Sequence, residues 1–287
     1  MSSTAGRHAR ESWGRRTGGP LTTHTVLLAG CVVMLFPYLW MLGTSFKPPD
    51  ETMLWPPRVL PIHWTWANYP KVMEAAPFVL YFFNSLLVSG GATLMVIGTS
   101  LLAGFIFGKY RFPGKKLLFI VILASAMFPF ETYMIPLYLT MKWFGWINTY
   151  QGIAAPYLIM SFGIFLMRQH IAHGIPDELV DAARVDGASE LRIFLRVIVP
   201  LCTSAVGAIG ILAFIQAWSA FIWPLLMATN KNMFLMELGL STFQFRFTTE
   251  YHLLCAASVL NTVPMLIAFV ILRRRIMESV ALTGLKG

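Results

Sequence analysis

Carboxylates are rare in the apolar parts of this sequence, and one of them is placed where it could do chemistry. Glu131 is the only acidic residue well inside an apolar stretch, and it lies between Pro129 and Pro136. A carboxylate inside a membrane is costly and usually faces a cavity or a partner, and the two prolines remove backbone hydrogen bonds and bend a helix. Two interpretations of Glu131 stay open: it lines a substrate path, or it lies near the outer interface or pairs with a neighbouring helix.

A second group of candidates lies in the stretch "QAWSAFIWP", residues 216–224. A substrate could stack on an aromatic face, so Trp218 could form part of a substrate wall, with Gln216 and Ser219 as its hydrogen-bonding members. Tryptophan near a membrane interface is more often an anchor. The substrate path is therefore one interpretation of this stretch, and interfacial anchoring is the other.

The sequence holds no phosphate-binding loop of the Walker A type. The nearest match, "GFIFGKY" at 104–110, has the wrong spacing and lacks Ser or Thr after the lysine. Gly104 and Gly108 instead predict a small-residue packing face, and Lys109 predicts a cytoplasmic anchor. Zinc-binding spacings, nucleophile motifs and inward pairs of carboxylates are also missing from the sequence. We therefore expect a chain that is not an enzyme, has no cofactor of its own and does not hydrolyse ATP itself.

The composition is that of an integral membrane protein. Of the 287 residues, 56% are hydrophobic and 12% are charged, and the mean hydropathy is +0.64, whereas soluble domains are about 25% charged. The net charge of +9 does not indicate nucleic acid, because the basic residues cluster beside apolar stretches, as topology signals do. The three cysteines lie inside apolar stretches without a metal-binding or CxxC pattern, which predicts small buried side chains.

Six stretches are apolar and long enough to cross a bilayer, which takes about 20 residues. They cover 25–46, 84–108, 117–139, 148–167, 201–227 and 253–272. The first has a long basic leader and no small-residue cleavage pattern, so it predicts an uncleaved anchor. The chain is expected to divide into an N-terminal segment 1–24, a membrane domain 25–272 and a C-terminal tail 273–287.

The basic residues outside these stretches are distributed unequally between the two sides. One side, with both termini and the second and fourth loops, holds 16 of the 22 Lys and Arg residues, and the other side holds 6. Cytoplasmic loops carry the excess of Lys and Arg. This bias predicts that both termini and the loop after the fourth stretch are cytoplasmic.

That loop is a charged, helix-forming segment, "DELVDAARVDGASELRIFLRVIVP", at 177–200. Pro176 suits a first helical turn, and Asp177 complements the positive end of the helix dipole. Gly187 can adopt the left-handed conformation that closes a helix, and Ser189 can cap a second one. The expected apolar residues are Leu179, Ala182 and Ala183 on the first helix, and Ile193, Phe194, Val197 and Ile198 on the second. From composition alone, the simpler interpretation is a loop whose amphipathic helices lie on the lipid headgroups.

Residues 180–200, "VDAARVDGASELRIFLRVIVP", closely resemble the EAA loop of ABC importer permeases. Asp181 stands where that family usually has Glu, and the other motif positions match: Ala182, Ala183, Asp186, Gly187, Ala188, Ile198 and Pro200. Further segments resemble the maltose-type second permease subunit: "HWTWANY" at 63–69, "FFNSLLVS" at 82–89, "FPGKK" at 112–116, "FPFETYMIPLY" at 128–138, "INTYQGIAAPY" at 147–157 and "LTGLKG" at 282–287. Residues 1–20 and 228–252 match poorly.

The resemblance implies an all-α membrane protein with six transmembrane helices, cytoplasmic termini and a coupling helix in the loop between helices 4 and 5. In that family the EAA loop docks into a groove on a cytoplasmic ATPase subunit, so residues 181–183 and 186–188 are the expected coupling residues. The implied substrate is a sugar or sugar derivative. The implied partners, in a bacterial or archaeal cytoplasmic membrane, are a homologous permease subunit, two ATPase subunits that bind ATP, and an extracytoplasmic substrate-binding protein.

Two other classes of protein stay open at this stage. An ion-coupled secondary transporter or channel is the main alternative, and a membrane-embedded enzyme is a more distant one. A proton- or sodium-coupled carrier normally needs more buried charge than Glu131 alone supplies, which favours the importer permease.

Overall fold

The computed structural model describes residues 20–244 and 249–284, with the side chains of 22–244 and 249–271. The basic leader before Pro20 and the last three residues of the "LTGLKG" match lie outside the described residues. Within the described ranges the chain is helical, and its only strand-like pairing is an isolated bridge between Gln244 and Thr249. This agrees with the all-α class expected from the sequence.

Three long helices meet the length and hydropathy of a membrane span without a sharp bend. They are α1 (Pro20–Ser45), α3 (Phe78–Lys109) and α14 (Tyr251–Gly284). α3 begins at Phe78 instead of at the predicted 84, because Pro77 supplies a non-helical N-cap and the helix starts directly after it. α14 continues beyond the predicted boundary at 272.

The other three candidate spans are each a pair of helices joined at a sharp bend, and the last of them, 190–218, begins before the predicted span 201–227. α4 (Lys115–Ser125) and α5 (Phe130–Trp143) meet at 97°. α6 (Tyr150–Ala154) with the 3₁₀ turn η2 (Ala155–Tyr157) meets α7 (Ser161–Gly174) at 51°. The segment of α9 (Glu190–Ile193), the π turn η3 (Phe194–Ile198) and α10 (Val199–Leu201) meets α11 (Thr203–Trp218) at 79°. Six spans therefore require that each bent pair crosses once.

Prolines account for where these bends fall. Pro129 has ψ of 141° and stands before α5 as an extended residue, since a proline cannot donate the bond that would continue α4 and also disfavours helix in the residue before it. Pro156 and Pro200 lie in the short helices next to the other two bends. The predicted bend near Glu131 is thus present, and it is much sharper than a kink inside one helix.

The remaining helices are short. They are α2 (Asn68–Ala75), α8 (Asp177–Val185), α12 (Ile222–Met227) and α13 (Met236–Leu240), with the 3₁₀ turns η1 (Pro49–Glu51), η4 (Lys231–Met233) and η5 (Ser241–Phe243). The predicted span 201–227 is interrupted after Trp218, so α11 and α12 are separate helices.

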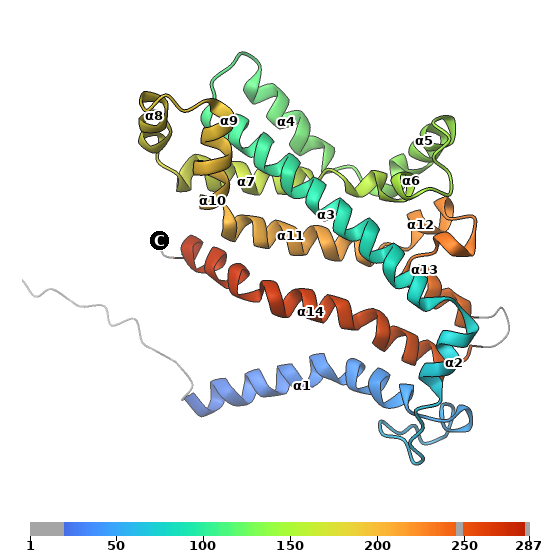
Figure 1. Ribbon diagram of the computed structural model, residues 1–287. Coiled ribbons are helices and arrows are strands. Elements are labelled where there is room, and N and C mark those ends of the chain that lie inside the picture. The colour runs from blue at the N-terminus through green and yellow to red at the C-terminus, as the bar shows by residue number, and fades with distance from the viewer. Residues whose placement is uncertain (1–19, 245–248, 285–287) are drawn as a thin grey trace, which may run out of the picture.

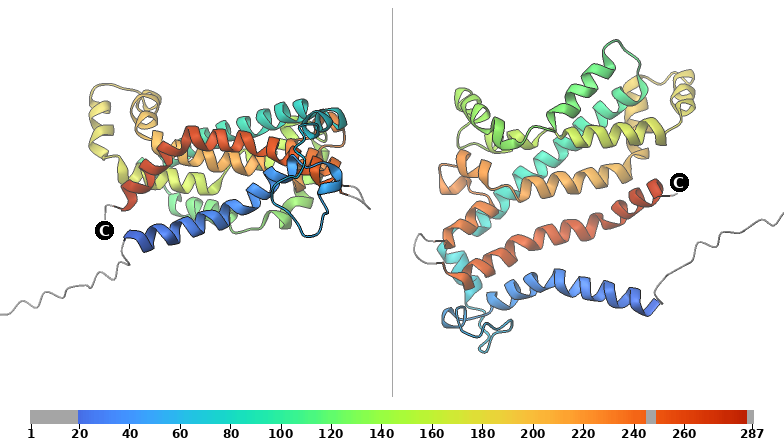
Figure 2. Two further views of the ribbon diagram at one scale, coloured as in Figure 1. Left: turned by 90° about the horizontal axis from the view of Figure 1, so that it is seen from below. Right: turned by 180° about the vertical axis from the view of Figure 1, so that it is seen from behind.

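α1, α14 and α11 lie side by side in this order, α3 crosses α11 and α7 and packs against both, and α4 lies outside α7 (Figure 1). The view from behind in Figure 2 shows the same order, with α1 at one edge against α14. The start of α1, the end of α14 and the α8–α9 segment lie at one end of the molecule, while α2, α12 and α13 lie at the other.

α3 is the central helix of the packed part of the molecule. It lies against α7 and α11, and its glycines allow the close approach that the sequence predicts. A Cβ at Gly104 would lie 2.6 Å from the Met167 side chain, and a Cβ at Gly108 would lie 3.0 Å from that of Ile171. The first distance is closer than a Cβ atom tolerates, and the second is tighter than nearly all Cβ contacts. The predicted small-residue face of α3 is therefore confirmed as the surface that packs on α7.

Candidate coupling site

The turn between α8 and α9 is built from local sequence signals. Pro176 is the N-cap of α8, one position earlier than the expected first turn, and Asp177 and Glu178 fill the first turn. At the other end Gly187 has φ of +76°, and the Gly187 and Ala188 amides donate to the carbonyls of Arg184 and Ala183 at 3.0 Å. These two bonds form a Schellman motif, which needs the left-handed residue that glycine provides.

The second helix of the segment returns the chain to the packed core. The Ser189 hydroxyl caps α9 by accepting from the Arg192 amide at 3.4 Å. The predicted apolar face is confirmed: Ile193 and Ile198 are fully buried, and Phe194 and Val197 pack against the same cluster. This cluster also contains residues of α3, α7 and α11, so the α8–α9 segment is anchored on the three helices at the centre of the fold.

An ion pair joins the end of α3 to the start of α8. Lys109 Nζ donates to the Asp177 carboxylate and to the Ile175 carbonyl, both at 2.5 Å. The Lys109 side chain is 3% exposed and that of Asp177 is 76% exposed. The ammonium is therefore buried between α3 and α8, and the carboxylate lies on its solvent side. Lys109 holds the pKa of the Asp177 carboxyl below its usual range through this hydrogen bond and its charge. The residue predicted as a membrane anchor is therefore an interhelical contact.

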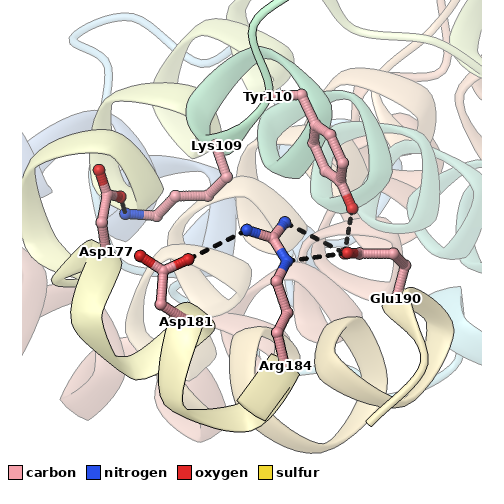
Figure 3. Close-up of polar contacts among 6 residues, drawn as sticks. All are labelled: Lys109, Tyr110, Asp177, Asp181, Arg184 and Glu190. Atoms are coloured by element: carbon pink, nitrogen blue, oxygen red, sulfur yellow. Dashed lines mark hydrogen bonds and ion pairs between the residues drawn. The ribbon is translucent and has the colours of Figure 1, made fainter. Parts of the chain in front are cut away.

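A second set of polar contacts surrounds Arg184 (Figure 3). Arg184 Nε donates to Glu190 at 2.9 Å and its Nη1 donates to Asp181 at 3.1 Å. The Tyr110 hydroxyl, directly after α3, donates to the same Glu190 carboxylate, and the guanidinium lies 5.8 Å from the centre of the Tyr110 ring. Arg184 and Tyr110 lower the pKa of Glu190 by these hydrogen bonds, while burial and the nearby Glu190 carboxylate raise the pKa of Tyr110. Glu190 thus links α8, α9 and the end of α3.

The structure corrects the expected apolar stripe of α8. Val180 is buried, and Ala183 is half-buried against the core. Leu179 and Ala182, which were expected to share the stripe with Ala183, are exposed instead. A helix turns 100° per residue, so Ala183 lies between Leu179 and Val180 around the helix axis, and contact with the core selects Val180 as its buried neighbour. Ala188 is half-buried, and the remaining motif positions, Asp181, Asp186 and Gly187, are exposed.

The exposed surface of the α8–α9 segment carries large apolar side chains as well as charged ones. Val185 is 87% exposed and Leu191 is 67% exposed, and both lie near the turn at Gly187. Among the described residues, none apart from its two chain neighbours has an atom within 4 Å of the position that a Cβ at Gly187 would take. Apolar side chains beside an open glycine turn form a surface that another protein can approach closely.

The substrate-path candidates do not come together into one site. Glu131 is exposed in the first turn of α5. Trp218 is fully buried, and its indole donates to Asn261 Oδ1 at 2.9 Å, which places it in the core between α11 and α14. Gln216 and Ser219 are exposed on either side of it. Trp218 packs in the core in this arrangement, and lining of a substrate path stays a prediction for the four candidates.

Sequence reasoning missed the polar residues that hold α8 in place. Lys109 and Asp177 are separated by 68 positions, and Tyr110 and Glu190 by 80. No periodic pattern connects residues so far apart. The available signal was the opposite charge of two segments that the topology prediction puts on the same side of the membrane.

Comparison with known proteins identifies the class to which this fold and site belong. Residues 100–280 match the family described as binding-protein-dependent transport system inner membrane component. The match covers more than half of the chain and includes α3 from Ser100 onward, the α8–α9 segment and most of α14. The chain belongs to this family and is an inner-membrane transport permease.

Several curated relatives align over nearly the whole chain. The arabinooligosaccharides transport system permease protein AraQ of Halalkalibacterium halodurans is 31% identical over 89% of this chain and 92% of its own length. The sulfoquinovosyl glycerol transport system permease protein SmoH of Agrobacterium fabrum is 32% identical, covering 88% and 89%. The diacetylchitobiose uptake system permease protein NgcG of Streptomyces coelicolor is 29% identical, covering 90% and 86%.

A solved structure has the same fold. The chain superimposes with a TM-score of 0.79 on a subunit of a bacterial ABC transporter involved in the import of the acidic polysaccharide alginate, over 88% of this chain and 95% of that one, at 19% identity. A second structure of an alginate ABC transporter, in complex with an alginate pentasaccharide-bound periplasmic protein, gives a TM-score of 0.65 over 88% of this chain and 92% of that one, at 14% identity. The fold expected from the resemblance is therefore confirmed.

Proposed function

We propose that this chain translocates a sugar or sugar derivative across the cytoplasmic membrane, as one permease subunit of an ABC importer driven by ATP hydrolysis on partner subunits. The substrate class is supported by the similarity to permeases whose names specify arabinooligosaccharides, diacetylchitobiose and sulfoquinovosyl glycerol. These three substrates share a glycosyl unit, so a carbohydrate is the common chemistry.

The proposed assembly holds this chain, a homologous permease, two ATPase subunits and an extracytoplasmic substrate-binding protein in a bacterial or archaeal membrane. The permease family requires a binding protein by its description, and a periplasmic protein is bound in one of the similar structures. The excess of Lys and Arg supports a cytoplasmic position for both termini and for α8. The common location of the start of α1, the end of α14 and α8 at one end of the molecule (Figure 1) agrees with this topology.

In this proposal α8 is the coupling helix, and the observation that carries it is the pair of contacts between α8–α9 and the end of α3. An ATPase surface that moves α8 pulls on Asp177 and Glu190, whose partners are Lys109 and Tyr110. Because α3 packs along α7 and α11, a displacement of its end moves the central helices together. The exposed Val185 and Leu191 are the proposed contacts with the ATPase.

The proposal is tested by changing an exposed contact residue in the reconstituted importer. Val185→Asp should leave the permease pair inserted and abolish uptake, because a carboxylate in an apolar groove loses its hydration, and it should loosen association with the ATPase subunits. Val185→Ala, which stays apolar, is the matched control and should transport. Ala182→Arg gives a second test on the exposed face, whereas Ala183 is half-buried in this subunit. Normal uptake by Val185→Asp and Ala182→Arg would contradict the proposal.

A further inference from the structure

The turn between α3 and α4 forms a groove that the proposed coupling function does not use. The chain leaves α3, reverses direction through Gly114, which has φ of +78°, and begins α4 at Lys115. A groove of about 840 Å³ lies between this turn, the first two turns of α4 and Arg168 of α7. Four residues of the "FPGKK" segment, which resembles the first cytoplasmic loop of sugar permeases, line the groove: Phe112, Gly114, Lys115 and Lys116.

Three cations line the groove, and the lining residues that the structure describes include no carboxylate. Lys115 Nζ donates to the Tyr110 carbonyl at 2.7 Å, and Arg168 Nε donates to the Phe107 carbonyl at 3.3 Å. The Arg168 guanidinium also lies over the Phe119 ring, 4.5 Å from its centre. Two of the cations are thus held in place by uncharged groups, and Lys116 is exposed beside them.

The electrostatic surroundings of Lys115 contain further positive charge. The charged groups that act on it most are Arg168 and Arg111, both cations. Like charges held close together repel one another. An anion that enters the groove therefore stabilises the cluster. This is a different situation from Lys109, whose charge is balanced by Asp177.

The other wall of the groove is apolar and exposed. Leu117 is 66% exposed and Ile120 is 50% exposed, and Phe119 lies half-buried between them on α4. The first two residues of α4 therefore carry positive charge, and the residues from Leu117 to Ile120 carry the apolar surface. A ligand that matches this order has an anionic head and an apolar tail.

The position of the groove at the end of a candidate membrane-spanning helix indicates which class of ligand it binds. The turn begins where α3, a membrane-spanning candidate, ends, and it lies near the α8–α9 segment (Figure 1). Anionic lipids give the cytoplasmic leaflet a negative surface potential, and basic grooves between helices on that side bind their headgroups. We propose that this groove binds an anionic phospholipid, with its phosphate among Lys115, Lys116 and Arg168 and an acyl chain along Leu117 and Ile120.

Native mass spectrometry of the assembled importer tests the proposal. The complex is released from nanodiscs that contain phosphatidylethanolamine with or without phosphatidylglycerol, and the lipid that stays bound is identified. Wild type should retain phosphatidylglycerol selectively. Each juxtamembrane cation strengthens attraction to anionic lipid by about 1 kcal/mol, or about fivefold, so Lys116→Gln with Arg168→Gln should lower retention about 25-fold. The matched control is Arg192→Gln with Arg196→Gln, two exposed cations of α9 and η3 that do not line the groove, and it should retain wild-type lipid.

A second pair of measurements distinguishes a lipid from a free phosphate. Ile120→Ser should weaken retention of phosphatidylglycerol, because the acyl chain loses apolar contact, and millimolar inorganic phosphate should not displace the lipid from wild type. If phosphate displaces the lipid and Ile120→Ser retains lipid as wild type does, the groove is a phosphate site and the proposal is wrong. Wild-type retention in the double Gln variant, or cross-linking of a cysteine at Lys116 to the partner permease in place of lipid, would also overturn it. None of these readouts depends on transport, so they are independent of the proposed sugar import.

Discussion

Lys109, the last residue of α3, donates a hydrogen bond of 2.5 Å to Asp177, the first residue of α8. The ammonium is almost fully buried and also donates to the Ile175 carbonyl. This contact joins α3, the central helix of the packed core, to the charged helix α8 outside it, and it gives the proposed coupling a direct mechanical path.

Reversing the charge of Lys109 or of Asp177 should impair energy coupling without impairing assembly of the importer. We expect Lys109→Asp and Asp177→Lys each to lower uptake at least tenfold while the ATPase subunits stay bound, because each places two like charges in contact. The double exchange should recover part of the uptake. The measurement is the ratio of substrate transported to ATP hydrolysed in proteoliposomes. Equal loss in the single and double variants would mean that the ion pair has no coupling role.

The ion pair should also give the loop a defined acid sensitivity. The hydrogen bond and charge of Lys109 lower the folded pKa of Asp177. A carboxyl with a lowered pKa stabilises the fold above its unfolded pKa and loses that contribution as pH falls through the folded value. Hydrogen exchange of residues 177–185, corrected for intrinsic rates, should stay constant from pH 8 to about pH 5 and rise below about pH 4. Asp177→Asn should exchange faster at neutral pH and show a smaller rise in acid.

The turn at Gly187 should tolerate residues according to their backbone preference. Gly187→Leu places a branched side chain at φ of +76°, which costs about 1 kcal/mol or more, and it also fills the open space beside Val185. We expect insertion to persist and uptake to be lost. Gly187→Asn, which adopts the left-handed conformation more readily, should retain most uptake. Asp181→Glu should be tolerated as well, since a carboxylate at 181 still accepts from Arg184.

Cysteine labelling should establish which side each loop occupies. Cysteines at Ser189 and Lys116 should react with impermeant reagent only from the cytoplasmic side, and cysteines at Trp55 and Lys231 only from outside. All four positions are exposed. Asn68 is unsuitable for this purpose because it is buried and donates to the Ser45 and Lys47 carbonyls at 2.8 Å. Labelling of Ser189 from outside in intact cells would reject the proposed topology.

The local features of this protein were determined by the sequence alone. The helical class follows from long apolar runs, and the turn of the α8–α9 segment follows from Gly187 and Ser189, whose conformational and capping preferences act within a few residues. The packing face of Gly104 and Gly108 was also predictable, because small residues at this spacing mark a close helix contact.

Only the tertiary structure decided which distant residues meet and which faces turn inward. The contact of Lys109 with Asp177 became visible only when α8 was placed against the end of α3, and the contact of the Trp218 indole with Asn261 only when α14 was placed against α11. The apolar stripe of α8 could not be assigned correctly, because Leu179, Val180, Ala182 and Ala183 are all apolar and only contact with the core selects 180 and 183. Such choices depend on packing energy between segments far apart in the chain, which no local pattern records.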